Sequence, residues 1–127
     1  FESIRQEELE LYNKGYSVNI IKKAIDIFHQ NKIMLRGNYV IPNDYTEDDF
    51  KVLSEYANSH KVAYAGYTIL TPMPGTVYYD QVKDQIIDYD LSKYNFFNSV
   101  TKTKLPLDTF YKSIAELWLI KKGTDVI

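Results

Sequence analysis

The first clear pattern along the chain is a run of apolar residues spaced three and four positions apart after Ser17. This spacing places them on one side of an α-helix, and the Ser17 hydroxyl is suited to accept a backbone N–H at the helix start. The stripe comprises Ile20, Ile21, Ala24, Ile25 and Phe28. A shorter helix is predicted over residues 5–14, because Gly15 is a favourable residue for ending one.

Two later segments have the composition of buried strands. Residues 33–41 alternate loosely and are rich in apolar and aromatic side chains, and Pro42-Asn43-Asp44 ends the run. Residues 62–70 (VAYAGYTIL) are almost continuously apolar, which is typical of a strand covered on both faces in a parallel sheet. Between them, Thr46 with Asp49 three positions later predicts the start of a helix that runs to near His60.

The C-terminal third is less regular. Residues 77–87 are predicted to be helical, residues 89–98 are predicted to be irregular, and a short strand at 96–100 is compatible with the sequence. A final helix follows Leu105-Pro106 and is ended by Gly123. Strands that alternate with helices predict an α/β fold with a parallel sheet of two or three strands. So few strands cannot close a barrel, so either the sheet is open or its other strands lie upstream of Phe1.

Composition then narrows the chemistry. The 127 residues include no cysteine, which excludes disulfides, thiolate metal sites and thiol nucleophiles within this chain. The net charge of −2 gives no support for nucleic acid binding, and no apolar run approaches the roughly 20 residues of a membrane span. We therefore expect a cytoplasmic protein. Because the chain begins with Phe1 rather than Met, we expect a fragment of a longer protein.

Familiar catalytic groupings are absent from the sequence. His29 and His60 are 31 positions apart with no acid or cysteine at metal-ligand spacing, so both are interpreted as surface residues. No nucleophile elbow, phosphate-binding P-loop or dinucleotide-binding glycine motif is present.

Candidate binding residues come instead from the carboxyl ends of the strands, where parallel α/β proteins bind ligands. Three such ends are predicted: Glu2-Ser3, if Phe1 ends a truncated strand, then 39–44 and 70–76. They would lie on one edge, so that Glu2, Asp44 and Thr71 could face a common space. The local alternatives stay open: Glu2 and Ser3 suit the cap of the following helix, and Asp44 suits a turn.

The order of these motifs resembles the C-terminal half of a radical S-adenosylmethionine (SAM) domain, most of all the subclass with an upstream cobalamin-binding domain. Phe1-Glu2-Ser3 followed by Asn13-Lys14-Gly15 resembles the segment after the family's fourth strand. Residues 37–44 have the spacing of the family's G-x-I-x-G-x-x-E motif. Leu70-Thr71-Pro72-Met73-Pro74-Gly75-Thr76 resembles its turn after the sixth strand.

The resemblance implies SAM-contacting roles at each strand end. It assigns the ribose or methionine part of SAM to Glu2 and Ser3, and the adenine to the second motif. In that motif Tyr39 stands for Ile, Ile41 for Gly and Asp44 for Glu. The full set of expected cofactor-binding residues is Glu2, Ser3, Gly37, Tyr39, Ile41, Asp44, Leu70, Thr71 and Pro72, with no catalytic residue or metal ligand in this chain.

The resemblance also implies what lies outside the chain. Residues 1–127 would form the C-terminal portion of a TIM-type barrel, with about three strands and their helices. The cysteine loop that binds a [4Fe–4S] cluster would lie upstream, as would any cobalamin domain. The parent would use SAM and the cluster, with cobalamin as a further candidate, for radical methyl transfer or another carbon-centred reaction. The isolated chain is expected to be inactive, to hold no cofactor, to pair with its missing N-terminal half and to self-associate through an open strand edge.

Two other functions are compatible with the residues alone. High aromatic content without a catalytic grouping also fits a non-catalytic α/β module that binds other proteins. The second of these hypotheses is an open-sheet nucleotide-binding domain. The sequence lacks the glycine-rich phosphate loop that such a domain would need.

Overall fold

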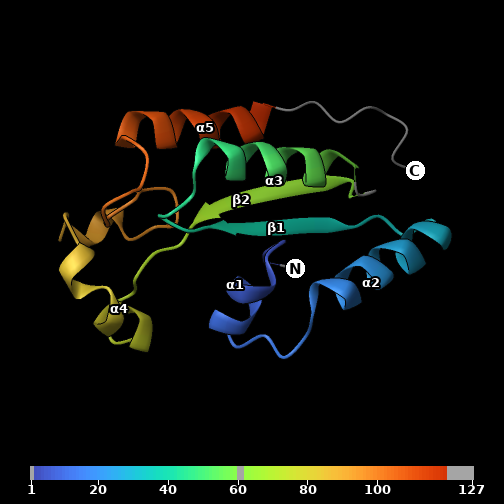
Figure 1. Cartoon of the computed structure of the whole chain (residues 1–127), viewed down its shortest axis with the longest axis horizontal. Coiled ribbons are helices and arrows are strands. Elements are labelled where there is room, and N and C mark those ends of the chain that lie inside the picture. Colours follow the sequence, from blue (N-terminus) through green and yellow to red (C-terminus); the bar gives the residue numbers. More distant parts are fainter. Residues whose placement is uncertain (1, 60–61, 120–127) are drawn as a thin grey trace.

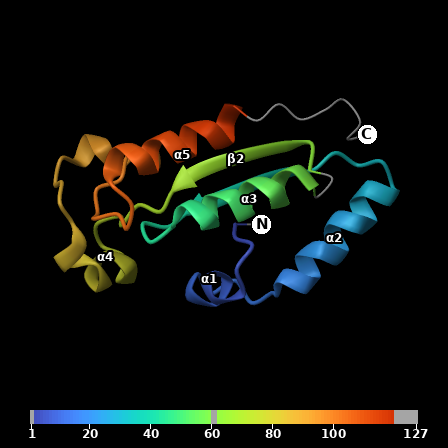
Figure 2. The ribbon, with the colours of Figure 1, turned by 45° about the horizontal axis from the view of Figure 1, so that its top comes forward.

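The structure is a computed structural model that describes residues 2–59 and 62–119. In chain order its elements are α1 (Gln6–Leu11), α2 (Val18–Gln30), β1 (Arg36–Ile41), α3 (Glu47–Ser59), β2 (Tyr64–Ile69), α4 (Val77–Gln81), the 3₁₀ turns η1 (Lys83–Gln85) and η2 (Leu91–Lys93), and α5 (Leu107–Leu119). Figures 1 and 2 show α3 and α5 running beside the strands on one flank, with α1 and α2 on the other. None of the helices in the described ranges is long and apolar enough to cross a membrane.

The two strands form a parallel pair, which confirms the α/β prediction. Tyr39 is the register partner of Tyr67, and α3 makes the crossover between the strands. The short strand that the sequence allowed at 96–100 is absent, and Phe96 has a φ of 68°. Ile86 and Thr101 instead form a single antiparallel bridge. The expected helix over 77–87 is shorter, because α4 ends at Gln81 and a 3₁₀ turn follows.

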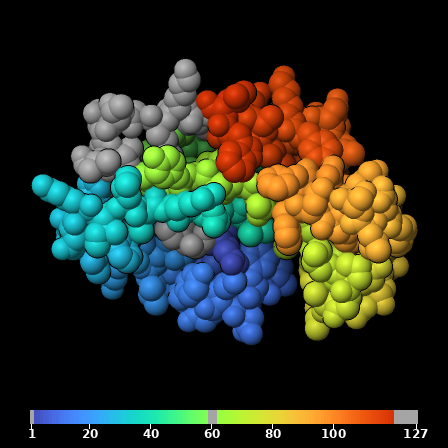
Figure 3. All heavy atoms as spheres, turned by 180° about the vertical axis from the view of Figure 1, so that it is seen from behind, coloured from blue at the N-terminus to red at the C-terminus, as the bar shows by residue number. Residues whose placement is uncertain are grey.

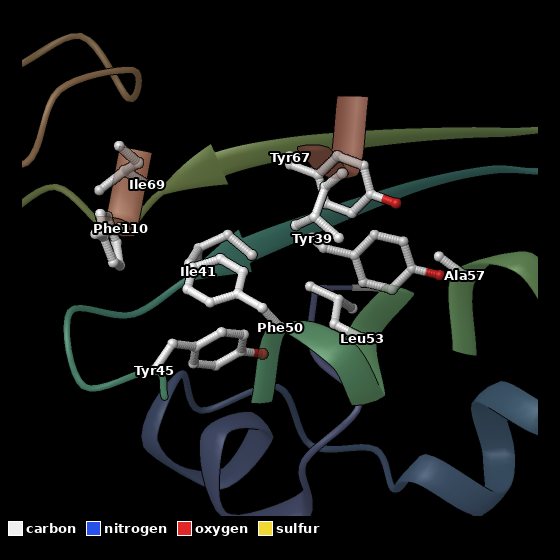
Figure 4. Packing of buried hydrophobic residues seen from close by; sticks show 10 residues of the cluster. Tyr39, Ile41, Tyr45, Phe50, Leu53, Ala57, Tyr67, Ile69 and Phe110 are labelled. Carbon is white, nitrogen blue, oxygen red and sulfur yellow. The ribbon is translucent and has the colours of Figure 1, made fainter. Parts of the chain in front are cut away.

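One face of the sheet forms the main core. Every second residue of β1 (Gly37, Tyr39 and Ile41) is buried, while Arg36 and Asn38, which alternate with them, are exposed. The ring of Tyr39 stacks on that of Tyr67, with centroids 5.6 Å apart. This face packs against buried residues of α3 and α5, which are Phe50, Leu53, Ala57, Phe110 and Leu117 (Figure 4).

A second, smaller cluster attaches the N-terminal helices. Leu9 of α1, Ile21 and Ile25 of α2 and Val62 before β2 are buried together. The predicted apolar stripe of α2 is only partly buried: Ile21 and Ile25 are covered, whereas Ile20 is 55% exposed.

The start of the described chain lies along the free edge of β1. Along a strand, the backbone N–H and C=O groups of successive residues point alternately to its two edges. The carbonyls of Leu35 and Ile41 accept hydrogen bonds from the β2 side. The N–H of Val40, the residue before Ile41, therefore points to the opposite edge. There the Val40 N–H donates to the carbonyl of Glu2 over 2.9 Å. Glu2 and Ser3 therefore lie beside the carboxyl end of β1.

Candidate functional site

The carboxyl end of β2 leads into a structured turn. The Thr71 hydroxyl is buried and donates to the carbonyl of Ile69 over 3.0 Å. Gly75 has a φ of 87°, which glycine adopts without strain. The Thr76 hydroxyl then accepts from the amide of Tyr79 over 3.1 Å and so caps α4. The turn and its cap fix α4 beside the strand end.

A mostly apolar pocket of about 340 Å³ lies between this turn, α4 and the end of α1. Leu70 and Thr71, two of the residues expected to bind SAM, form part of its wall. The remaining lining residues are Leu11, Tyr12, Met73, Thr76, Val77, Tyr78 and Gln81. The pocket therefore lies at the carboxyl end of a parallel strand, the usual place for a ligand in this class of fold.

Two tyrosines give the pocket polar character. Burial raises the pKa of Tyr12 well above its usual range, and the charges of Glu8, Asp44 and Glu2 raise it further. Burial also raises the pKa of Tyr78, with a second contribution from Asp44. Both phenols are therefore protonated at neutral pH and each carries an O–H group that can donate a hydrogen bond.

The buried hydroxyl of Tyr12 has no hydrogen-bond partner among the described residues. Most buried polar groups in folded proteins are paired, so a donor without a partner among the described residues, beside a pocket, is a candidate for binding a ligand atom.

Beside the pocket, α1 is held by a compact ionic network. Ser3 donates to the buried carboxylate of Glu8, and Arg5 forms an ion pair with Glu8 over 3.0 Å. Arg5 also pairs with Asp49 at the start of α3 and lies 4.5 Å from the ring centre of Tyr45. Burial raises the pKa of Glu8, against the opposing effects of Ser3 and Arg5. This network fixes the position of Tyr12 relative to the strand ends.

The predicted site residues divide into two groups in space. Glu2, Asp44, Leu70 and Thr71 lie around the pocket or close enough to shift the pKa of Tyr12. The Glu2 carboxylate forms an ion pair with Lys14 over 2.8 Å. Ser3 serves the ionic network, and Pro72 is buried after Thr71.

The other group lies away from the pocket. Gly37, Tyr39 and Ile41 belong to the face of β1 that packs on α3 and α5. The SAM-contacting roles of all nine residues remain predictions.

Tyr12 and Tyr78 were missed by the sequence analysis, which named Tyr39 as its only tyrosine candidate. A usable signal was the position of Tyr12 directly before Asn13-Lys14-Gly15, at the end of a helix that follows a strand end. Within the described residues, no cluster of three or more His, Cys, Asp or Glu side chains could hold a metal ion.

No protein-family model matches the chain. The chain resembles the C-terminal part of a radical SAM domain, as its motifs predict, and similarity to known enzymes confirms this resemblance. It is 26% identical over 106 residues to a bacteriochlorophyllide d C-12(1)-methyltransferase of Chlorobaculum tepidum, covering 82% of this chain. It is 31% identical over 107 residues to the bacteriochlorophyllide d C-8(2)-methyltransferase of the same organism, covering 80% of this chain. An anaerobic magnesium-protoporphyrin IX monomethyl ester cyclase of Cereibacter sphaeroides is 27% identical over 104 residues.

The matched region is a minor part of each relative. It covers 23% and 24% of the two methyltransferases and 17% of the cyclase. The similarity therefore concerns one segment that two reaction types share.

Proposed function

We propose that this chain forms one wall of the active site of a radical SAM enzyme that carries out methyl transfer or another carbon-centred transformation. The observation that carries the proposal is the pocket at the carboxyl end of β2, which is lined by Thr71 and by Tyr12, whose hydroxyl has no partner among the described residues. The named methyltransferases and the cyclase support the reaction class.

The residues at this pocket fit a ligand such as SAM, which combines apolar and polar parts. Leu70 and Met73 offer apolar surface, and Tyr12 and Tyr78 offer phenol donors for oxygen atoms. Asp44 brings negative charge close to Tyr12 and Tyr78, which suits the positive sulfonium and amino groups of SAM. When bound, SAM and a [4Fe–4S] cluster would supply the radical that starts the reaction.

The share of this chain in the reaction is positioning and exclusion of water. Thr71 is held by its bond to Ile69, and α4 is held by its Thr76 cap, so the pocket wall is fixed before a ligand arrives. Tyr12 stays protonated because burial raises its pKa, and it therefore donates a hydrogen bond without moving a proton.

We further propose that the two strands are part of a TIM-type barrel. The hydrogen bond from Val40 to the Glu2 carbonyl supports this proposal, because it places the chain ahead of α1 along the edge where the preceding barrel strand would pair. The cysteine loop for the cluster, and any cobalamin domain, would then lie in upstream sequence.

The decisive experiment uses the full-length parent with its cluster reconstituted. We expect the parent gene to encode a three-cysteine loop upstream, and the purified protein to cleave SAM under reducing, anaerobic conditions. Thr71→Val and Tyr12→Phe should each raise the KM for SAM, whereas Tyr111→Phe, on α5 and outside the pocket, should not. A parent that lacks the three cysteines, or that cleaves SAM equally well with both pocket variants, would refute the proposal.

The isolated chain provides a second test. Because the cluster iron that anchors SAM is absent, we expect weak or undetectable SAM binding to the 127-residue chain by calorimetry. Submicromolar binding would contradict this expectation.

A protein-interaction module is the second candidate function. It is supported by large apolar side chains on the surface, among them Leu11 at 63%, Ile27 at 58% and Leu91 at 70% exposure. Sedimentation separates the two functions, because an open barrel edge predicts self-association and a complete module predicts a monomer.

A further inference from the structure

The apolar surface of α2 is wider than the part of it that packs against the rest of the described chain. Ile21 and Ile25 are buried in the smaller cluster. Beside them, Ile20 is 55% exposed and Ile27 is 58% exposed. This surface belongs to the flank formed by α1 and α2, which Figure 3 shows, in shades of blue, below the strands and opposite the red α5.

The exposed residues form a second apolar stripe next to the buried one. Ile20, Ala24 and Ile27 are four and three positions apart, which places them on one face of the helix. Phe28, 38% exposed, lies between this face and the buried face. We call Ile20, Ala24, Ile27 and Phe28 the outer stripe of α2. The remaining side of the helix carries the polar residues, which are Lys22, Lys23, Asp26 and Gln30. A helix face that stays in water is normally polar, so the outer stripe has the composition of a face that packs against a partner.

A hollow at the N-terminal end of α2 continues this surface. It has a volume of about 340 Å³, and its lining includes Ile20 of the outer stripe, Gln6 and Glu10 of α1, and Tyr16 between the two helices. The Val18 N–H donates to the side-chain carbonyl of Gln6 over 3.1 Å, so the two helices that form the hollow are tied together. An apolar stripe that ends in a hollow fits a partner helix that inserts a side chain there.

The place where the chain enters the fold points to the occupant. The Val40 N–H donates to the Glu2 carbonyl at the free edge of β1, and α1 and α2 follow directly in the sequence. Sequence that precedes Phe1 in a longer protein would therefore reach the molecule on the flank of α1 and α2. The matched segment is 23% and 24% of the two methyltransferases, so most of the length of these relatives lies outside it. In parallel α/β folds the helices of successive units lie side by side in one layer.

We propose that the outer stripe of α2 and the adjoining hollow bind the apolar face of a helix from the sequence that precedes Phe1 in the parent. The proposal goes beyond the proposed function, because neither a cysteine loop nor a strand at the edge of β1 specifies what covers α2. It requires that the parent extend upstream of the 127 residues, and it does not depend on SAM chemistry. The driving force is the removal of the outer stripe from water.

The test measures how fast a maleimide reagent labels a single cysteine placed on α2, since the chain itself has no cysteine. Ile27→Cys lies in the outer stripe, and Asp26→Cys lies on the polar side as the matched control. In the isolated chain we expect both positions to be labelled at similar rates. In the parent, labelling of Ile27→Cys should slow at least about tenfold, because the helix must open locally before the reagent enters, while Asp26→Cys keeps its rate. Peptide mass spectrometry separates position 27 from the cysteines of the parent.

A second measurement compares thermal unfolding of the isolated chain and the parent. Ile27→Glu should leave the unfolding midpoint of the isolated chain nearly unchanged, because Ile27 is exposed there. In the parent it should lower the midpoint by several degrees, because a carboxylate would be buried against an apolar helix. Gln30→Glu adds the same charge on the polar side of α2 and should have the same small effect in both proteins.

Two results would overturn the proposal. One is equal labelling of Ile27→Cys in the parent and in the isolated chain. The other is protection in the isolated chain that grows with its concentration, because the occupant would then be a second copy of this chain. Both results would leave the proposed function intact, because that function is tested by the upstream cysteines and SAM cleavage of the parent. A parent that does not cleave SAM would end the proposed function, whereas protection of position 27 in it would still support the helix interface.

Discussion

Tyr12 provides a sharp test of the pocket, because its hydroxyl is buried and unpaired within the described residues. Burying a hydroxyl without a hydrogen bond costs about 1–3 kcal/mol. Phenylalanine keeps the ring and removes only the oxygen, so Tyr12→Phe should stabilise the ligand-free chain by at least about 1 kcal/mol. Ionisation cannot relieve the cost, since burial raises the pKa of Tyr12 and keeps the phenol neutral.

The assay is urea unfolding followed by circular dichroism, compared with a matched variant. Tyr111 accepts a hydrogen bond from the amide of Ser99 over 2.8 Å, so Tyr111→Phe should lose about 1 kcal/mol. The two Tyr→Phe changes therefore have opposite signs. In thermal unfolding, 1 kcal/mol corresponds to a midpoint shift of roughly 4 °C for a domain of this size.

A result in which Tyr12→Phe is neutral or destabilising would refute the reasoning. It would mean that the Tyr12 hydroxyl already has a hydrogen-bond partner in the ligand-free chain and is not available to a ligand. If Tyr12→Phe is stabilising and also raises the KM for SAM in the parent, the residue exchanges stability for binding, as functional sites commonly do.

Three further predictions concern the frame that holds the site. Phe110→Ala should destabilise the chain by about 3–5 kcal/mol in urea unfolding, because Phe110 is 0% exposed beneath Phe50, whereas Leu119→Ala on the surface should change stability by less than about 0.5 kcal/mol. Asp49→Asn should cost about 1 kcal/mol at pH 7 by weakening the cap with Thr46 and the pair with Arg5. Burial raises the pKa of Asp49, but the hydrogen bonds from Thr46 and the charge of Arg5 outweigh burial and lower this pKa. The contribution of Asp49 to the free energy of unfolding is therefore complete above the ordinary pKa of aspartate, about 3.9, and is lost as the pH falls further. The stability difference between wild type and Asp49→Asn should therefore shrink below about pH 4, and a constant difference would contradict this account. Asn43→Ala should accelerate amide hydrogen exchange at Lys102 and Lys104, because the Asn43 amide donates to the Lys102 carbonyl over 3.0 Å, while Asn58→Ala on the surface of α3 should not.

Local patterns predicted most of the regular elements. The N-cap at Ser17 and the Thr46–Asp49 pair are present, since both depend on residues only three positions apart. Residues 77–87 and 96–100 were predicted less well. There the backbone is organised by contacts distant in sequence, such as Asn43 with Thr101 and the Phe96 carbonyl with Ile69.

The sequence by itself predicted the α/β class and the positions of the two strand ends, and its lack of cysteine excluded thiol chemistry within the chain. Hydrophobic periodicity and residue inventory are local properties, so no coordinates were needed for these conclusions. Only the tertiary structure decided which side of β1 each residue occupies. It placed Tyr39 and Ile41 in the core, brought Tyr12 to the β2 turn, and left Ile20 and Ile27 of α2 exposed. Contacts between residues distant in sequence depend on strand register and helix docking. These are set by packing across the whole chain rather than by neighbours in sequence.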